Sequence, residues 1–555
     1  MANLENAPKN YSVLVNEIST GQVKIPQFQR QFVWDMVASA KLLDSILKGY
    51  PIGTFIFWRT NEQLRAIRNI GKIKLPDQNH NEFVNYVLDG QQRLTSFYAA
   101  VKGEEIEREN GKTENFANIY IDLDANEEQD IVIIDISKKE PCSFIKLTDI
   151  MEGDFTYLGS FPPKYQNQIR KYQGILKGYN FNVINLKDAS IDVATEVFTR
   201  LNVGGKALSL FEIMVAKTYD SIRKFDLAEK YLSLCKSLET AGYEDISSAT
   251  VLQILSIFLT KDCSRKQILK LDKKEIIDIW DDAVESLHKA IDFLRCYGVV
   301  VSRLLPYNAI LVPFSFFFYK NKKNPTGETK KMMEDFFWRA ALGQRYSSAV
   351  ESKLAQDIQK IDKILTGELP KYEWSIDISP ESLKKIGYFS TGRSFIKAIL
   401  CLYAMKKPKS FNTNLDVIID NSYLKVSTSK NYHHFFPKAY MNKNHPEIEY
   451  WKYNNILNIT IVDAQLNKND IRTKSPSKYM KAFKKVNEEI DNTMKTHLIN
   501  DLEKFGIWFD DYEKFFTERA KIVSKELKKL IIEQETGSEE QLEPVENEEG
   551  TVSEE

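Results

Sequence analysis

The stretch that governs the interpretation of this chain lies near the C-terminus and reads Asn431-Tyr432-His433-His434-Phe435-Phe436-Pro437-Lys438, then Leu457-Asn458-Ile459-Thr460-Ile461-Val462, then Gln465-Leu466-Asn467-Lys468-Asn469. The chain has only six histidines, and two of them are adjacent here. One imidazole of such a pair can ligate a divalent metal ion while the other takes a proton from water. Because successive strand side chains point to opposite faces, the pair needs a turn to converge, and the Pro437 segment can supply it.

At these residues the chain resembles the HNH nucleases, and it is most similar to the C-terminal HNH domain of modification-dependent restriction enzymes of the GmrSD type. His-His, Asn and Asn on strand, strand and helix is the ββα-metal arrangement. The resemblance implies that His433 ligates Mg²⁺, Mn²⁺ or another divalent ion and that His434 is the general base. It also implies that Asn458 holds the base-bearing loop and that Asn467 is the second metal ligand, with Asn469 as a competing candidate.

This ligand set differs from the usual one, which has Asp or Glu at the first position and often His at the last. The site at His433 and Asn467 is therefore more neutral than in most HNH nucleases. An adjacent pair of histidines also occurs as a surface or packing pair, but the spaced asparagines and the apolar run 456–462 favour the nuclease site. A structural zinc site is disfavoured, because no cysteine lies near.

A second motif follows a predicted strand at 85–88 and precedes a predicted helix from Leu94, and it reads Asp89-Gly90-Gln91-Gln92-Arg93. Gly90 permits a tight turn, and the helix N-terminus offers free N–H groups to an anion such as phosphate. Arg93 could add a bidentate contact to phosphate oxygens, and Asp89 could hold a metal ion or position water. The alternative is a simple capped connection between strand and helix. The chain contains no Walker A loop.

This motif is part of a longer pattern: Ile25-Pro26-x-Phe28-Gln29-Arg30-x-x-Val33-Trp34, Tyr50-Pro51-Ile52-Gly53, Leu88 to Thr95, and Glu196 to Leu208. Together these segments resemble the N-terminal domain of the GmrSD-type proteins, which has a ParB/sulfiredoxin-like fold and binds and hydrolyses nucleoside triphosphate. The resemblance implies that GTP or another nucleoside triphosphate binds at Asp89, Gly90, Gln91, Gln92 and Arg93. It places Gln29 and Arg30 along the lining of that site.

Length and composition predict a multidomain α+β protein, because 555 residues are too many for one core. We expect a ParB/sulfiredoxin-like nucleotide-binding domain at 1–220, a helical middle domain at 221–402 and an HNH domain within flanking helices at 403–532. The remaining segment, 533–555, has ten acidic residues and no basic one, which predicts a disordered tail. Without that tail the net charge changes from −1 to +9, a mild excess that suits a nucleic-acid partner.

Several local predictions follow from periodicity and residue type. Apolar spacing predicts a helix at 36–47, and β-type residues predict strands at 54–58 and 131–136. The chain from 211 to 402 is predicted to be mainly helical, with a core segment at 315–319. Arg345-Tyr346 and Gly392-Arg393-Ser394 are candidates for contacts to a DNA backbone, and their alternative is ordinary solvated charge.

Five scattered cysteines without a CxxC pair predict reduced, buried thiols, and no signal peptide is visible. The longest apolar run, Ala309 to Tyr319, has 11 residues, against the ~20 needed to cross a bilayer. We therefore expect a cytoplasmic protein without a membrane partner.

Together these features predict a nucleotide-dependent and metal-dependent DNA endonuclease of prokaryotic antiphage defence. By resemblance, its substrate is double-stranded phage DNA that carries a modification. Two alternatives stay open: a ParB-like DNA-binding regulatory protein with a degenerate HNH domain, and an RNA-cutting toxin of an abortive-infection system. The sequence leaves the oligomeric state open, a homo-oligomer included.

Overall fold

The computed structural model describes residues 3–26, 32–62, 64, 66–67, 69–70, 73–74, 83–107, 113–126, 128–201, 209–220, 222–421, 424, 432–463, 466, 471 and 473–534. Among the predicted site residues, Gln29, Arg30, Asn467 and Asn469 lie outside these ranges, as does the tail from residue 535. The chain divides into two compact units, Met1–Ala228 and Glu229–Glu555. The prediction of a multidomain protein of mixed helices and strands is confirmed.

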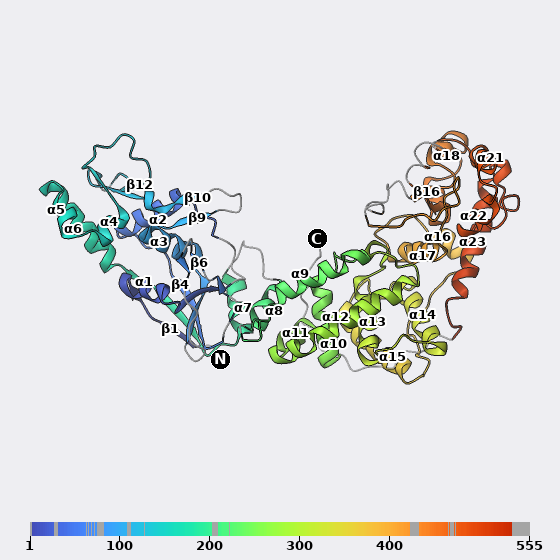
Figure 1. Cartoon of the computed structure of the whole chain (residues 1–555), viewed down its shortest axis with the longest axis horizontal. Coiled ribbons are helices and arrows are strands. Elements are labelled where there is room, and N and C mark those ends of the chain that lie inside the picture. The colour runs from blue at the N-terminus through green and yellow to red at the C-terminus, as the bar shows by residue number, and fades with distance from the viewer. Residues whose placement is uncertain are drawn as a thin grey trace. The chain divides into compact units, whose positions relative to one another are not determined.

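A six-stranded mixed sheet organises the N-terminal unit (Figure 1). Its order is β1 (Asn3–Asn6), β15 (Val183–Lys187), β4 (Phe55–Thr60), β8 (Val84–Asp89), β3 (Val23–Pro26) and β5 (Ala66–Ile67). The pairs β15–β4 and β3–β8 are parallel, and the other pairs are antiparallel. Phe55, Phe57 and Val87 on the central strands are fully buried, because helices and loops cover the sheet. The strands predicted at 54–58 and 85–88 are observed as β4 and β8, with ends shifted by one or two residues.

Helices surround this sheet: α1 (Tyr11–Ser19), α2 (Met36–Leu47), α3 (Gln91–Lys102), α4 (Leu147–Glu152), α5 (Phe155–Gly159), α6 (Pro163–Gly178), α7 (Ile191–Leu201) and α8 (Leu210–Thr218). The helix predicted at 36–47 has the observed bounds of α2. Its N-terminus is fixed by Asp35, whose side chain accepts a hydrogen bond from the N–H of Ala38 at 2.8 Å. Helix α2 packs against α3 and α6.

Short strands complete the unit: β2 (Lys9–Asn10), β6 (Asn69–Ile70), β7 (Ile73–Lys74), β9 (Glu105–Glu107), β10 (Thr113–Asn115), β11 (Tyr120–Asp122), β12 (Val132–Ile133), β13 (Phe144–Lys146) and β14 (Asn180–Phe181). The strand predicted at 131–136 is wrong in length, because only β12 forms. The carboxylate of Asp44 accepts the N–H groups of Ile131 and Val132 at 2.6 and 3.3 Å, and Asp135 turns the chain by accepting the N–H of Ser137.

The second unit begins with the helices α9 (Leu227–Leu238), α10 (Ser248–Thr260), α11 (Arg265–Lys270), α12 (Lys273–Arg295), α13 (Leu311–Lys320), α14 (Gly327–Leu342), α15 (Val350–Leu365), α16 (Pro380–Ile386) and α17 (Ser394–Met405). Helix α13 is the core of this bundle and packs against α10, α12 and α15 (Figure 1). Phe316, Phe317 and Phe318 are fully buried, which confirms the predicted core segment.

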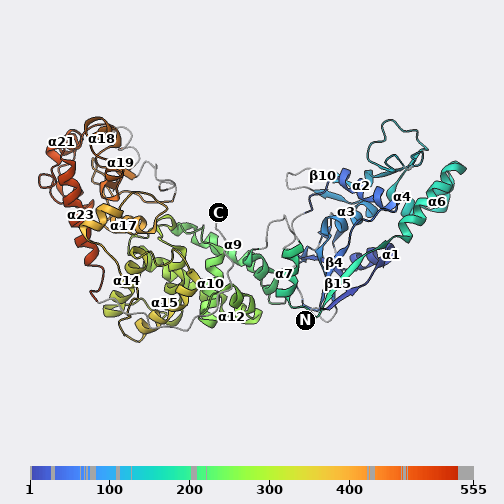
Figure 2. The same cartoon turned by 180° about the vertical axis from the view of Figure 1, so that it is seen from behind.

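The rest of the unit holds β16 (Tyr432–His434), α18 (Lys438–Asn444), α19 (Tyr450–Tyr453), β17 (Ile459–Ile461), α21 (Pro476–Val486), α22 (Ile490–Thr496) and α23 (Tyr512–Lys528) (Figure 2). Helix α23 packs against α16, and α17 packs against β17. Arg519 of α23 is fully buried, donates to the carbonyl of Ile459 at 3.1 Å and lies 5.0 Å from the ring of Tyr403. These contacts place the expected boundary between 402 and 403 inside one compact unit.

Two further expectations concern membrane-spanning helices and the state of the cysteines. In the described part of the chain, no helix is both long and apolar enough to span a membrane. All five cysteines are free, and Cys263 and Cys401 are buried. Cys142 and Cys296 are exposed, so the prediction of burial is wrong for these two thiols.

A buried ion pair on α14 holds the end of the described chain. Arg339 donates from Nε to Asp335 at 2.9 Å and from Nη2 to the carbonyl of Ile532 at 2.6 Å. The N–H of Ile532 donates to the Asp335 carboxylate at 2.8 Å. Asp335 is fully buried and Arg339 is 6% exposed, so both charges depend on these partners.

We predict that truncation after Gln534 leaves the stability of the second unit unchanged, because it removes none of these contacts. Truncation after Leu530 should lower the free energy of unfolding by about 2–5 kcal/mol, since two hydrogen bonds to buried charges are lost. Thermal and denaturant unfolding of both truncated chains measure the difference. Equal stability of the two would contradict a structural role for Ile532.

Candidate functional site

The two adjacent histidines lie on β16, which pairs antiparallel with β17. His433 is opposite Thr460 and His434 is opposite Ile459. The turn predicted to bring the rings together begins only after His434, where the N–H of Phe435 donates to the carbonyl of Asn458 at 2.8 Å. Both histidines are therefore strand residues, and their rings contact different partners, as the alternation of strand side chains requires.

Asn458 fixes the backbone directly after the histidine pair. Its side chain is fully buried, and its Oδ1 accepts the N–H of Phe436 at 2.8 Å. Its Nδ2 donates to the carbonyls of Phe436 and Tyr453 at 3.0 and 2.9 Å. Three of the four hydrogen bonds that an amide can make are thus used to hold two backbone segments together. The predicted role of Asn458 is to hold the loop that bears the base, and these bonds have the geometry for that role.

His434 is half-buried, and its Nε2 lies 3.0 Å from Oδ1 of Asn454. Nδ2 of Asn454 donates to the carbonyl of Phe389 at 3.4 Å, which orients Oδ1 toward the ring. Because this oxygen can only accept, we assign the ring proton to Nε2 and the lone pair to Nδ1. Burial lowers the pKa of His434 to about 4, against the opposing effect of the Asn454 hydrogen bond. The imidazole is therefore neutral at pH 7, with one nitrogen able to accept a proton.

Asn454 is a site residue that the sequence analysis missed. The only signal was its position in the doublet Asn454-Asn455, four residues before the asparagine that was singled out. Asn455 has a different use, because its side chain accepts the N–H of Leu457 at 3.0 Å and donates to the carbonyl of Lys384 at 2.9 Å. Only the structure separates the two amides.

His433, the predicted metal ligand, is 2% exposed and packs among aromatic rings. Its ring centroid lies 6.1 Å from that of Tyr479 and 6.4 Å from that of Phe411. Among the residues that the structure describes, no group of three or more His, Cys, Asp or Glu side chains could hold a metal ion. The second predicted ligand, Asn467, and its competitor Asn469 lie outside that part of the chain.

In the N-terminal unit, the Asp-Gly motif forms the connection from β8 to α3. Strand β8 ends at Asp89, and Gly90 precedes α3 in the left-handed conformation, with φ 91°. Gly90 at the N-cap makes no side-chain hydrogen bond to this helix, and the dipole of a helix N-terminus favours an anion. A Cβ atom at position 90 would lie 2.4 Å from Cδ1 of Phe55, so both conformation and space require glycine.

Arg93 brings two of the sequence segments together. It donates from Nη1 to the carbonyl of Ile52 at 2.6 Å, and from Nη2 to the carbonyl of Thr54 and to Asp89, both at 3.1 Å. A Cβ atom at Gly53 would lie 2.3 Å from Nη1. The guanidinium thus fastens the loop after Tyr50-Pro51 to the end of β8. In this structure its Nη atoms donate to protein groups, where the sequence suggested a bidentate contact to phosphate.

The two glutamines of the motif are buried, and Gln92 holds the segment at Val33 and Trp34. Gln92 accepts the N–H groups of Val33 and Trp34 at 2.8 and 3.3 Å, and its Nε2 donates to Oε1 of Gln91 at 3.2 Å. Residues 32–34 directly follow the segment that contains Gln29 and Arg30, which lies outside the described residues. The side chain of Asp89 is 39% exposed, against 19% for Arg93, so its carboxylate is the more accessible charge of the motif.

We predict that Gly90→Ala destabilises the N-terminal unit by about 1–3 kcal/mol, because alanine is strained at this φ and its Cβ meets Phe55. Gly174→Ala is the matched control. Gly174 is an exposed residue of α6 with no atom within 4 Å of its Cβ position. This change should stabilise the unit by about 0.5–1 kcal/mol. Denaturant unfolding measures both, and two changes of the same sign would contradict this account.

Comparison with known proteins finds a family match for the N-terminal part of the chain. Residues 11–219 match the family model of the GmrSD restriction endonuclease N-terminal domain. The resemblance to this family is therefore confirmed for the N-terminal unit. Over 597 aligned positions the chain is also 24% identical to an uncharacterized protein of Methanocaldococcus jannaschii. That alignment covers 95% of this chain and all of the relative.

Proposed function

We propose that this protein is an NTP-dependent and metal-dependent DNA endonuclease of prokaryotic antiphage defence. The match to a restriction endonuclease family supports DNA as the substrate. The observation that carries the proposal is the setting of His434, a neutral imidazole oriented by Asn454 at 3.0 Å and followed by a loop that Asn458 holds. Double-stranded phage DNA with a modification is the proposed target.

In the proposed reaction, Nδ1 of His434 accepts a proton from water while the water oxygen attacks the scissile phosphorus. The bond from phosphorus to the 3′ oxygen breaks, and the leaving oxygen takes a proton from solvent water to give the 3′ hydroxyl. A pKa near 4 makes the free imidazole a weak base. A bound phosphodiester would raise that pKa, because its negative charge favours the imidazolium. Substrate binding would thus strengthen the base at the moment when it is needed.

His433 and Asn467 are the residues that would hold a divalent metal ion in this proposal. When bound, such an ion would polarise the scissile phosphate and stabilise charge on the leaving oxygen. Because the rings of His433 and His434 alternate on β16, the proposal requires a local change of β16 that brings both rings to the same phosphate. The donor that the structure describes, the buried imidazole of His433, suits Zn²⁺, Ni²⁺ or Fe²⁺ better than Mg²⁺, which prefers oxygen ligands. The cofactor we propose is therefore a divalent ion that accepts nitrogen ligands, with Mg²⁺ and Mn²⁺ among the ions to be compared.

The proposed nucleotide site lies at the connection from β8 to α3. The uncapped N-terminus of α3 would receive phosphate oxygens of GTP or another nucleoside triphosphate. The exposed carboxylate of Asp89 would position a metal ion or water. Arg93 links this site to the loop of Ile52, so nucleotide binding and the position of that loop would be coupled.

One observation favours a second candidate function, a DNA-binding regulatory protein with a degenerate HNH domain. Within the described residues His433 is the one predicted metal ligand, and no group of three carboxylate, thiol or imidazole side chains surrounds it. Metal-dependent nicking separates the two candidates, because the regulatory protein would bind DNA without cutting it. Parallel digestion of plasmid and RNA tests the toxin alternative.

We predict that His434→Ala lowers the rate of plasmid cleavage by ~10²–10⁴, the usual contribution of a positioned general base. His445→Ala is the matched control, because it removes another partly exposed histidine of the same unit, with a side chain that is 26% exposed. Nicking of supercoiled plasmid in the presence of each divalent ion measures both rates. If His434→Ala cut at the wild-type rate, the nuclease assignment would fail.

We predict that Asp89→Ala and Arg93→Ala each abolish nucleoside triphosphate hydrolysis. Asp89→Ala removes the accessible carboxylate, whereas Arg93→Ala also releases the loop of Ile52. Asp130→Ala removes an exposed carboxylate elsewhere in the same unit and should hydrolyse at the wild-type rate. Turnover of GTP and ATP by each variant measures the effect, and thermal unfolding checks that each variant is folded. Unchanged turnover in Asp89→Ala would refute the proposed nucleotide site.

A further inference from the structure

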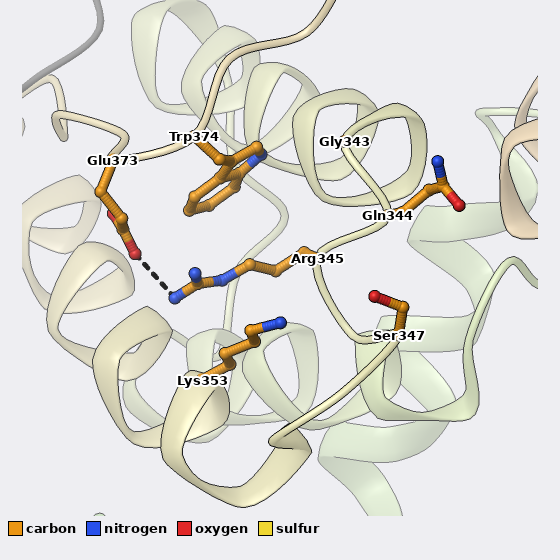
Figure 3. Close-up of a pocket in the computed structure, with 7 residues that line it drawn as sticks. All are labelled: Gly343, Gln344, Arg345, Ser347, Lys353, Glu373 and Trp374. Carbon is orange, nitrogen blue, oxygen red and sulfur yellow. Dashed lines mark ion pairs between the residues drawn. The ribbon is translucent and has the colours of Figure 1, made fainter.

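The helical part of the second unit contains a polar cavity of about 400 Å³ at the loop between α14 and α15 (Figure 3). Its lining includes Arg345, Ser347, Lys353, Glu373 and Trp374. The volume lies within the range of pockets that bind small molecules. Figure 3 shows Trp374 and Lys353 on opposite sides of the Arg345 guanidinium.

Arg345 was a candidate for a contact to a DNA backbone, with solvated surface charge as the alternative. It is only 7% exposed, so it is not a solvated surface charge. It donates from Nε and Nη2 to Asp357, both at 3.1 Å, and Nη2 also contacts Gln356 at 2.6 Å and Glu373 at 2.8 Å. Trp374 covers the guanidinium at 4.3 Å. Within the described part of the chain, no acceptor is found for Nη1. A buried guanidinium held on one edge thus keeps two N–H donors for another partner.

The charges around the cavity do not cancel. Asp357 and Glu373 also pair with Lys360, at 3.2 and 3.0 Å, so these two carboxylates balance Lys360 and Arg345. Lys353 adds a further positive charge. It donates to Oγ of Ser348 at 3.3 Å, and among the described residues it forms no ion pair with a carboxylate. Burial lowers the pKa of Lys353, and the charge of Arg345 lowers it further. The site therefore has one positive charge that lacks a counter-ion.

The loop that forms the cavity is held in a strained conformation. Gln344 and Ala349 have positive φ angles of 53° and 49°, which non-glycine residues rarely adopt. Such strain costs of order 1–3 kcal/mol for each residue and is kept where the surrounding contacts fix it, frequently at ligand sites. The network around Arg345 and Asp357 supplies those contacts, and Tyr346 adds a hydrogen bond to Asp357 at 2.8 Å. The cavity is thus preformed.

We propose that this cavity binds a phosphate group, through the free Nη1 of Arg345, the ammonium of Lys353 and the hydroxyl of Ser347. These three residues all line the cavity, and a guanidinium, an ammonium and a hydroxyl match the several oxygens of a phosphate. The phosphate belongs to a free nucleotide or to a nucleic-acid backbone, since both present the same group. This inference does not depend on the proposed nuclease activity.

Isothermal titration calorimetry of the full chain with inorganic phosphate, adenosine monophosphate and a short DNA duplex tests the proposal. Arg345 is left unchanged, because its removal would take two guanidinium hydrogen bonds from the buried Asp357 and leave only Lys360 and Tyr346 as its partners. We expect Lys353→Gln to weaken binding of at least one probe by ~10-fold or more. Lys363→Gln, which removes an exposed lysine from the same helix, should change it less than about twofold. Ser347→Ala should give a smaller loss than Lys353→Gln.

The probes distinguish the sources of the phosphate. Dependence on Lys353 for the monophosphate but not the duplex identifies a free nucleotide, and the reverse identifies a nucleic-acid backbone. Dependence on Lys353 that persists in the Arg93→Ala chain places the site in the helical unit, apart from the proposed nucleotide site. Absence of binding by all probes, or equal affinities of Lys353→Gln and Lys363→Gln, would overturn the proposal.

Discussion

The buried amide of Asn458 is the constraint on which the C-terminal site depends. It accepts the N–H of Phe436 and donates to the carbonyls of Phe436 and Tyr453, so one side chain fixes three backbone groups. Each of these groups would cost about 1–3 kcal/mol if it were left buried without a partner. The loop after the histidine pair therefore has one stable position. Through it, His434 is presented at the end of β16 with its ring beside Asn454.

In the N-terminal site, polar side chains likewise hold backbone segments together. Arg93 bonds the carbonyls of Ile52 and Thr54, while Gln92 bonds the N–H groups of Val33 and Trp34. In both units, polar side chains of the predicted sites join backbone segments: Asn458 was expected to do so, whereas Gln92 and Arg93 were expected to bind nucleotide. The groups proposed for chemistry are the carboxylate of Asp89, whose side chain is 39% exposed, and Nδ1 of His434, which carries the lone pair. This division separates positioning residues from candidate catalytic residues.

The sequence predicted those features that local patterns determine. Helix α2 was predicted with its observed bounds, because its apolar residues repeat at helical spacing, and the structure adds a cap by Asp35. Strand β12 was predicted too long, since Asp135 turns the chain after it and Asp44, 87 residues away, bonds the backbone of Ile131 before it. The role of Asn454 and the burial of Arg345 also depend on residues distant in the sequence, so no local pattern could reveal them. The parts of the site that involve Gln29, Arg30 and Asn467 remain predictions.

The central claim is that nucleotide use in one unit serves DNA cleavage in the other. The most direct measurement is cleavage of modified and unmodified phage DNA by the whole chain, with and without each nucleoside triphosphate, in the presence of a divalent ion. The account predicts that modified DNA is cut, and that cutting requires at least one hydrolysable nucleotide. Equal cleavage of both DNAs without nucleotide, or no cleavage of either DNA under any condition, would contradict it.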